Sequence, residues 1–371
     1  MSYINKYLRN FKPYKVASHA IWNVTAENRS NVLKLDWNEA TVDPAPQVAE
    51  RLHKLITDGS FLNLYPATNN DRLMELLSAY TGLDSKYIQY FASSDSLEEY
   101  ISKLFITVGD PVLLLWPSYD NFRLTAQVAG AHVMYYEMDQ DFSFNASMFE
   151  EKIDRKNPSL VYICNPNNPT GLQLPKDYIE HLLVKYPETM FLIDEAYWEF
   201  SGITCQELVT RFDNILVART MSKAFALANV RFGYLISSAE NIQFISSIRN
   251  PKNITTFAQE AVIGALENTQ YMWNYVECVK RARDWFAESI NQLPGSRFHA
   301  YASSGNFVMI QCCDQLTKQE ILAHLQRNNI YIRNISQSES VKNCVRVSIG
   351  LQEQMERVVD CFVEYCASSG K

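Results

Sequence analysis

Residues 189–223 read TMFLIDEAYWEFSGITCQELVTRFDNILVARTMSK. Apolar residues fill 190–193 and 215–218, and polar side chains follow each run at once: Asp194 after the first, Thr220 to Lys223 after the second. A short apolar run bounded by polar residues is typical of a strand that is buried on both faces. The segment therefore predicts two buried strands with chemically active groups at their carboxyl ends.

The same pattern continues outward from this segment. Similar apolar runs lie at 110–117, 131–138, 159–164 and 231–237. Apolar residues at helical spacing lie at 47–59, 70–82 and 175–187. Strands that alternate with helices form a largely parallel sheet covered on both faces, and ligands gather at the carboxyl ends of its strands. We expect an α/β fold with its site at that edge.

The pattern changes near residue 256. One long helical stretch at 258–293 is followed by alternating strand-like and helical segments, at 306–312, 318–328, 330–335 and 344–350. A chain of 371 residues is long enough for two domains. We expect residues 1–40 to form an N-terminal arm and part of a small domain, 41–255 a large domain, and 256–371 a smaller α+β domain.

Composition argues against several classes of protein. Lys plus Arg is 34 and Asp plus Glu is 41, so the net charge of −7, without a basic block, makes nucleic acid an unsuitable partner. No signal peptide is evident at Met1 to Phe11, and no run of 18 apolar residues predicts a membrane partner. The eight cysteines fit neither a metal site nor a disulfide framework. Reduced thiols in a cytoplasmic protein are the expectation.

Lys223 stands directly after a predicted buried strand. Most lysines in such a Ser-Lys context are solvated surface groups, so the pair alone is weak evidence. A free ammonium behind a buried strand would be costly to dehydrate, and an imine to pyridoxal phosphate (PLP) removes that cost. PLP also needs an acid at its ring nitrogen, donors for its phosphate and a partner for its ring hydroxyl.

Asp194, Tyr197 and Asn168 meet these other demands. Asp194 follows four apolar residues, where it would pair with the ring nitrogen or, alternatively, cap the next helix. Tyr197, three residues later, is within reach of the ring hydroxyl. Asn168 lies in NPNNPTG, which a simple tight turn would also explain.

Three segments in this order, CNPNNPTG, FLIDEAYWEF and RTMSKAFALANVRFGY, resemble the fold-type I PLP aminotransferases of class I/II. More narrowly, they are similar to the histidinol-phosphate aminotransferase family. The segments FKPY, LDWNEA, LNLYP, PSY, IYIRN and CVRVSIG extend the resemblance over nearly the whole chain. It implies a mostly parallel seven-stranded sheet flanked by helices, a smaller α+β domain and PLP as cofactor.

The resemblance also implies a role for each matching residue. Catalysis would fall to Lys223, Asp194 and Tyr197. The cofactor would further be held by Ser94, Asp95, Tyr119, Asn168, Thr220, Ser222, Arg231 and, from a partner subunit, Tyr65. The substrate would meet Tyr14, Asn38, Arg333 and Arg346. Tyr65 and Tyr119 are two of 21 tyrosines, for which simple packing is the alternative, as a surface ion pair is for Arg333.

The sequence departs from the family pattern near the phosphate. Ser93 stands where glycine is expected and Ser96 where glutamate is expected, while Asn229 and Val230 replace Gly-Leu. Serine still donates hydrogen bonds, but a loop without this glycine is less free to adopt positive φ. These changes leave open whether histidinol phosphate is the substrate.

The expected reaction moves an amino group between a small-molecule amino donor and a keto-acid acceptor such as 2-oxoglutarate. A PLP-dependent decarboxylase of the threonine-phosphate type shares the same motifs and is the first alternative. A non-catalytic PLP-fold binding protein is the second. The resemblance further implies a homodimer.

Overall fold

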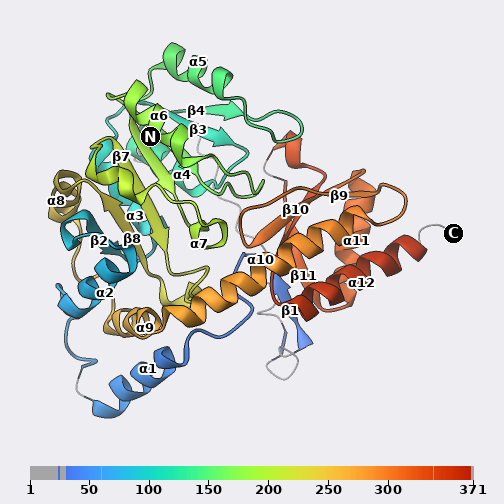
Figure 1. Cartoon of the computed structure of the whole chain (residues 1–371), viewed down its shortest axis with the longest axis horizontal. Helices are drawn as coiled ribbons and strands as arrows, with labels where there is room; N and C mark the ends of the chain where they lie inside the picture. The colour runs from blue at the N-terminus through green and yellow to red at the C-terminus, as the bar shows by residue number, and fades with distance from the viewer. Residues whose placement is uncertain (1–23, 26–30, 60, 337, 369–371) are drawn as a thin grey trace, which may run out of the picture.

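The computed structural model describes residues 24–25, 31–59, 61–336 and 338–368. Tyr14, predicted to line the substrate side, lies outside these residues. Two sheets organise the described chain, and Figure 1 shows them side by side. Among the described residues, no helix is long and apolar enough to cross a membrane.

The large sheet has seven strands in the order β2-β8-β7-β6-β5-β3-β4. They are β2 (Ile88–Phe91), β3 (Pro111–Trp116), β4 (His132–Glu137), β5 (Leu160–Cys164), β6 (Met190–Asp194), β7 (Ile215–Thr220) and β8 (Gly233–Ser237). Only β8 runs antiparallel to its neighbours, so the mostly parallel seven-stranded sheet is confirmed. Strand β2 was not predicted, because its four residues carry too short a pattern.

Helices cover both faces of this sheet, since every residue of β5, β7 and β8 is buried. These helices are α2 (Asp71–Thr81), α3 (Ser94–Phe105), α4 (Asn121–Ala129), α5 (Ala146–Lys156), α6 (Lys176–Lys185), α7 (Trp198–Ser201) and α8 (Ala239–Ile248). Helix α3 packs against β7 and β8, which places its first turn beside the carboxyl end of β7.

The small sheet has the order β1-β11-β12-β10-β9. Its strands are β1 (Leu33–Leu35), β9 (Phe298–Ala300), β10 (Phe307–Cys312), β11 (Ile330–Asn334) and β12 (Cys344–Ser348). Helices α11 (Gln315–Arg327) and α12 (Gln352–Ser368) accompany it. Because β1 pairs with β11, an N-terminal segment joins the C-terminal sheet. The segment after β1 then leads directly toward the site.

The prediction of one long helix at 258–293 is wrong in one respect, because the structure has two helices there. Helix α9 (Thr256–Leu266) ends before Asn268, and α10 (Thr269–Asn291) begins after it. Asn268 leaves helical geometry and its side chain accepts a hydrogen bond from Tyr271 N at 3.3 Å. Helix α9 packs on α1 (Pro46–Asp58), while α10 extends across to the small sheet (Figure 1). The domain boundaries at 40 and 255 stay predictions.

Candidate active site

The carboxyl ends of β5, β6 and β7 meet at one edge of the large sheet. In the parallel register, Cys164 lies opposite Asp194, and Asp194 lies opposite Ala218. The loop after β5 therefore brings Asn168 beside the end of β6, and the loop after β7 brings Lys223 to the same edge. The structure thus brings together three of the residues singled out from the sequence.

The amine of Lys223 lies within the site. Its Nζ donates a hydrogen bond to Trp37 O at 2.9 Å and lies 5.8 Å from the centre of the Tyr197 ring. Burial, with a further contribution from the positive charge of Arg346, lowers the pKa of Lys223 to about 8. A neutral amine, the form that attacks an aldehyde, is therefore far more populated near neutral pH than in an ordinary lysine.

Asp194 is the last residue of β6 and is 3% exposed. The Tyr162 hydroxyl donates to its Oδ2 at 2.8 Å, and the Ala196 backbone N–H donates to its Oδ1 at 3.1 Å. Burial raises the pKa of Asp194 to about 6, although both hydrogen bonds act in the opposite direction. Asp194 does not cap the next helix, which was the alternative role. Its Oδ1 instead accepts a hydrogen bond from a turn N–H two residues ahead.

A chain of hydrogen bonds links Arg346, Asn168, Tyr197 and Asn38. Arg346 Nη1 donates to Asn168 Oδ1 at 2.5 Å, and Asn168 Nδ2 donates to the Tyr197 hydroxyl at 3.1 Å. Asn38 Nδ2 donates to the same hydroxyl, also at 3.1 Å. Burial raises the pKa of Tyr197, which keeps its phenol neutral. Two segments distant in sequence therefore donate to one tyrosine oxygen, and a third, which carries Arg346, is linked to it through Asn168.

The start of helix α3 forms a second corner of the site. Ser93 precedes the helix with φ 112°, and its hydroxyl accepts a hydrogen bond from Ser96 N at 3.1 Å. A serine therefore adopts the positive φ that was expected to favour glycine, at a cost of about 1–3 kcal/mol. In β8, a Cβ on Gly233 would lie 2.5 Å from Ser94 N, so only glycine lets the strand and the loop approach this closely.

Other predicted cofactor residues surround this corner. Asp95 accepts hydrogen bonds from the Tyr119 hydroxyl at 3.0 Å and from Arg231 Nη2 at 2.9 Å. Thr220 Oγ1 donates to Ser222 Oγ at 2.9 Å. A helix N-terminus, two hydroxyls and a guanidinium thus lie together, which is the donor set that a phosphate dianion prefers.

Two predicted residues stand apart from these contacts. Tyr65 is 80% exposed, with Lys252 Nζ 4.9 Å from its ring centre. Arg333 lies in β11 directly opposite Arg346 of β12. Residues opposite each other in antiparallel strands share one face of the sheet, so both arginines point to the face that contacts Asn168.

Sequence reasoning missed Tyr162 and Glu98. Tyr162 was read only as one residue of an apolar strand, although a hydroxyl two residues before Cys164 was a signal that a buried partner exists. Glu98, in α3, is 1% exposed and accepts a hydrogen bond from Asn121 Nδ2 at 2.6 Å. Burial, with the nearby charges of Asp194 and Asp95, raises the pKa of Glu98 well above its usual range.

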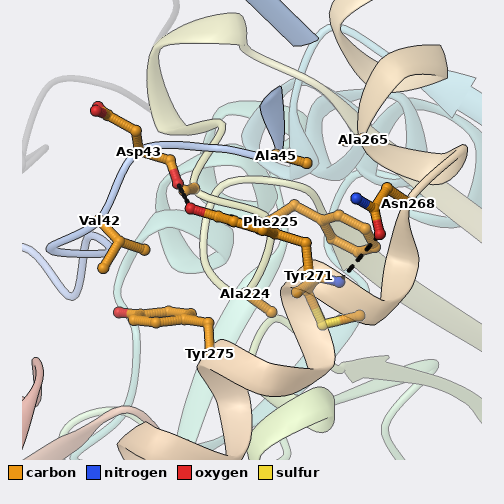
Figure 2. A pocket seen from close by; sticks show the side chains of 11 residues that line it. Val42, Asp43, Ala45, Ala224, Phe225, Ala265, Asn268, Tyr271 and Tyr275 are labelled. Carbon is orange, nitrogen blue, oxygen red and sulfur yellow. Dashed lines mark hydrogen bonds between the residues drawn. The ribbon is translucent and has the colours of Figure 1, made fainter. Parts of the chain in front are cut away.

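A small cavity lies behind the loop that carries Lys223, between that loop and helix α10. Figure 2 shows Ala224 and Phe225 on one of its walls and Tyr271 and Tyr275 on another. Its volume is about 10 Å³, no more than one water needs, so no substrate fits there. The Tyr271 hydroxyl donates to Asp43 O at 3.2 Å (Figure 2), which ties the segment after β1 to α10.

Comparison with known proteins identifies the family. The family model "Aminotransferase class I and II" matches residues 30–362. This chain belongs to the class I and II aminotransferases. A dihydroxyacetone phosphate transaminase of Campylobacter jejuni is 39% identical over 99% of this chain and 98% of its own length. A histidinol-phosphate aminotransferase of Ruminiclostridium cellulolyticum is 31% identical, with 98% of each chain covered.

Solved structures agree with the fold of this aminotransferase. A histidinol-phosphate aminotransferase of Sinorhizobium meliloti, in complex with pyridoxal-5'-phosphate, superposes with a TM-score of 0.86 at 22% identity, covering 99% of this chain and 98% of that one. The predicted fold type and its enzyme class are confirmed, and PLP is the cofactor of the family.

The site of the aminotransferase fits PLP in its own chemistry. Lys223 supplies a primary amine of lowered pKa, and Asp194 supplies a buried acid whose hydrogen-bond donors are uncharged. The close approach at Gly233 leaves the first turn of α3 beside the end of β7, so backbone N–H groups and hydroxyls lie on one side. Each kind of group that PLP requires therefore has a candidate residue in this cluster.

Proposed function

We propose that this aminotransferase transfers an amino group to and from a small substrate that carries a phosphate monoester, with a 2-keto acid such as 2-oxoglutarate as the second partner. The observation that supports this substrate class is that Arg333 of β11 lies directly opposite Arg346 of β12 in the sheet. Like charges directly opposite each other destabilise a sheet. An anion between the two guanidiniums offsets that repulsion, and a phosphate is suited to bind both.

The relatives support the same substrate class. Dihydroxyacetone phosphate and histidinol phosphate, in the names of two relatives, share a phosphate monoester beside the reacting carbon. The higher identity to the dihydroxyacetone phosphate transaminase favours the smaller substrate. We therefore take dihydroxyacetone phosphate, or the amine formed from it, as the first compound to test.

The proposed cofactor roles follow from the clusters described above. Lys223 would bond PLP, Asp194 would face its ring nitrogen, and Asn168 with Tyr197 would hold its ring hydroxyl. The phosphate would bind Ser94, Asp95 N–H, Thr220, Ser222 and Arg231, while Tyr119 would cover one face of the ring. When bound, PLP supplies an electron sink for the charge that develops at the substrate's α-carbon.

Proton transfer is the part that the protein's own residues perform. Lys223, once released by the substrate amine, is proposed to move the proton at the substrate's α-carbon. A general base works best with a pKa near the working pH, and the value of about 8 for Lys223 meets that condition. Arg346, held by Asn168 Oδ1 at 2.5 Å and Asp36 O at 2.8 Å, would fix the orientation of the substrate anion.

A substrate panel tests the proposal. Glutamate as donor would be combined with dihydroxyacetone phosphate, the keto form of histidinol phosphate, and dihydroxyacetone itself. We expect the phosphorylated acceptors to have the higher kcat/KM. Arg333→Gln should lower kcat/KM for them by roughly tenfold to a hundredfold, as expected for a lost hydrogen bond to a charged group. Its effect on dihydroxyacetone should be small; equal losses on both would contradict the anion site.

Lys223→Ala tests the chemistry itself. The variant should lose transamination, and borohydride should no longer attach PLP to the chain. Lys176→Ala, which removes an exposed lysine paired with Glu207, is the matched control and should keep full turnover. Carbon dioxide release without a keto acid would favour the decarboxylase alternative, and PLP binding without turnover on any of the amines would favour the binding protein.

A homodimer in the cytoplasm completes the proposal. The apolar side chains of Ile56, Leu62, Leu64 and Tyr65 are 61–80% exposed, as suits a segment covered by a second copy. Sedimentation at twice the chain mass of 42.7 kDa would support the dimer. All eight cysteines are free, and five of them are buried, which fits a reducing compartment.

A further inference from the structure

We propose that Tyr162 is a positioning residue that keeps Asp194 ionised, so that the proton between this carboxylate and the ring nitrogen of PLP stays on the nitrogen. The inference rests on the proposed role of Asp194 at that nitrogen. Tyr162 is expected to touch neither cofactor nor substrate and to act only through Asp194.

The geometry makes Tyr162 a dedicated partner of Asp194. Its hydroxyl lies 2.8 Å from Asp194 Oδ2, and the side chains are 0% and 3% exposed. Strands β5 and β6 run parallel, with Tyr162 opposite Leu192 and Cys164 opposite Asp194, so the tyrosine reaches diagonally to the acid. The ring stacks on Phe122, with centroids 5.0 Å apart and an interplanar angle of 15°. This packing fixes the direction of the hydroxyl.

The surroundings of Asp194 otherwise favour its neutral form. Burial acts first, and the ionisable groups that bear on it from the neighbouring elements are Asp95 and Glu98 of α3, Cys164 of β5, and Tyr197. Asp95 opposes a further negative charge there. The hydrogen bonds from Tyr162 and from Ala196 N stabilise the carboxylate, whereas the Cys164 thiol donates to Pro166 O at 3.3 Å. Burial and Asp194 itself raise the pKa of Tyr162 far above neutral pH, so its hydroxyl keeps the proton that it donates.

The balance between burial and these hydrogen bonds decides whether the shared proton lies on the ring nitrogen or on Asp194. With the carboxylate stabilised, the proton stays on the ring nitrogen and the pair is an ion pair. Without the Tyr162 bond, the proton affinity of Asp194 rises, and the same proton moves from nitrogen to oxygen. The total charge is unchanged, but the ring becomes neutral and less able to accept electrons. The effect is therefore visible on the ring nitrogen and not only in turnover.

Tyr162→Phe is the direct test, because it removes one oxygen and keeps the ring stacked on Phe122. PLP labelled with ¹⁵N in the ring would be added to the apoprotein, and the nitrogen signal would be followed from pH 6 to pH 9. We expect the signal to lie closer to the neutral-nitrogen position than in the unmodified protein throughout this range, because the shared proton moves to Asp194. The dissociation constant of PLP should also rise by about tenfold or more, as for a lost hydrogen bond to a charged group.

Two controls separate positioning from structure. Tyr136→Phe removes another tyrosine hydroxyl of the same sheet, which bonds Asn145 O and N, both at 3.1 Å, and should change neither signal nor affinity. If Tyr162→Phe fails to fold, 3-fluorotyrosine placed at position 162 keeps the shape and makes the hydroxyl a stronger donor. Its nitrogen signal should then lie closer to the protonated position than in the unmodified protein at the same pH.

The outcomes also separate this inference from the function on which it rests. If Asp194→Asn leaves the nitrogen signal unchanged, the proposed role of Asp194 is wrong. If Asp194→Asn changes the signal while both substitutions at position 162 leave it unchanged, only the role of Tyr162 is overturned. A change in stability without a change in the nitrogen signal would likewise overturn it, because a structural role predicts that result.

Discussion

Asp194 and Glu195 are consecutive acids at the end of β6, yet they enter two different environments. Asp194 points to the cofactor side, where its donors are uncharged. Glu195 is 1% exposed and receives both Nε and Nη2 of the fully buried Arg219, at 3.0 and 2.9 Å. Successive side chains along a strand point to opposite faces, so one peptide step separates a structural ion pair from a carboxylate prepared for a ligand.

On the ion-pair side, the Glu195 carboxylate accepts further hydrogen bonds besides those from Arg219. Thr204 Oγ1 and Cys205 N also donate to Glu195, at 2.8 and 2.6 Å. The Arg219 guanidinium lies 4.1 Å from the centre of the Trp198 ring. On the cofactor side, by contrast, the Asp194 carboxylate has no charged donor among its hydrogen-bond partners, and burial raises its pKa to about 6. The difference supports the proposal that Asp194, and not Glu195, faces the cofactor.

The largest expected effect is the loss of the buried ion pair. Arg219→Met leaves Glu195 buried without its cation, which should lower the free energy of unfolding by about 3–5 kcal/mol. Urea unfolding of the apoprotein measures this loss. The matched control is Arg211→Met, which breaks the exposed pair with Glu180 and should cost far less. The double variant Glu195→Leu with Arg219→Met should recover part of the loss; equal costs for Arg219→Met and Arg211→Met would remove the contrast.

Asp194→Asn should have the opposite profile: a large effect on activity and none of the damage to the fold. We expect kcat to fall at least about a hundredfold, equivalent to about 2.7 kcal/mol. In the apoprotein the folded pKa of Asp194, about 6, is above its usual 3.8, so the stability it contributes is present below pH 4 and lost as the pH rises through 6. Because Asn cannot ionise, the Asp194→Asn variant does not lose this stability as the pH rises. Thermal unfolding should therefore find the apo variant more stable at pH 7.5 and unchanged at pH 4.

The sequence predicts the cofactor side better than the ion-pair side. Lys223, Asp194 and Asn168 each follow an apolar run, and parallel strands necessarily bring such positions to one edge. Arg219 belongs to the same strand end, but nothing in its local sequence indicates Glu195 as its partner, because their proximity depends on the register of β6 and β7. Tyr162 and Glu98 were missed for the same reason, because their partners Asp194 and Asn121 are also distant in sequence.

The fold was predicted where periodicity is strong and missed where it is weak. Strands β3 to β8 gave clear apolar runs, whereas β2 has four residues and β9 has three. The break between α9 and α10 depends on Asn268, a single residue whose capping role depends on the conformation it adopts there. Ser93 shows the reverse case, since a serine at φ 112° breaks the expectation that glycine was needed.

The smallest expected effect lies at Glu98, on the cofactor side of the comparison. Burial first, and then the charges of Asp194 and Asp95, raise its pKa, which favours its neutral form. Glu98→Gln then replaces one neutral side chain by another of the same size and keeps an acceptor for Asn121 Nδ2. We expect the free energy of unfolding to change by less than about 1 kcal/mol. PLP affinity should stay within about twofold, equivalent to about 0.4 kcal/mol.

The same variant shows whether one or two acids are charged behind the cofactor. If Glu98 is neutral, the loss of apoprotein stability that is complete near pH 6 belongs to Asp194 alone, and Glu98→Gln leaves its pH range unchanged. An ionised Glu98 would repel the Asp194 carboxylate, and its removal would move the end of that loss to lower pH. Such a shift would mean that the cofactor side tolerates two like charges without a cation, and the contrast with Glu195 and Arg219 would then need a different explanation.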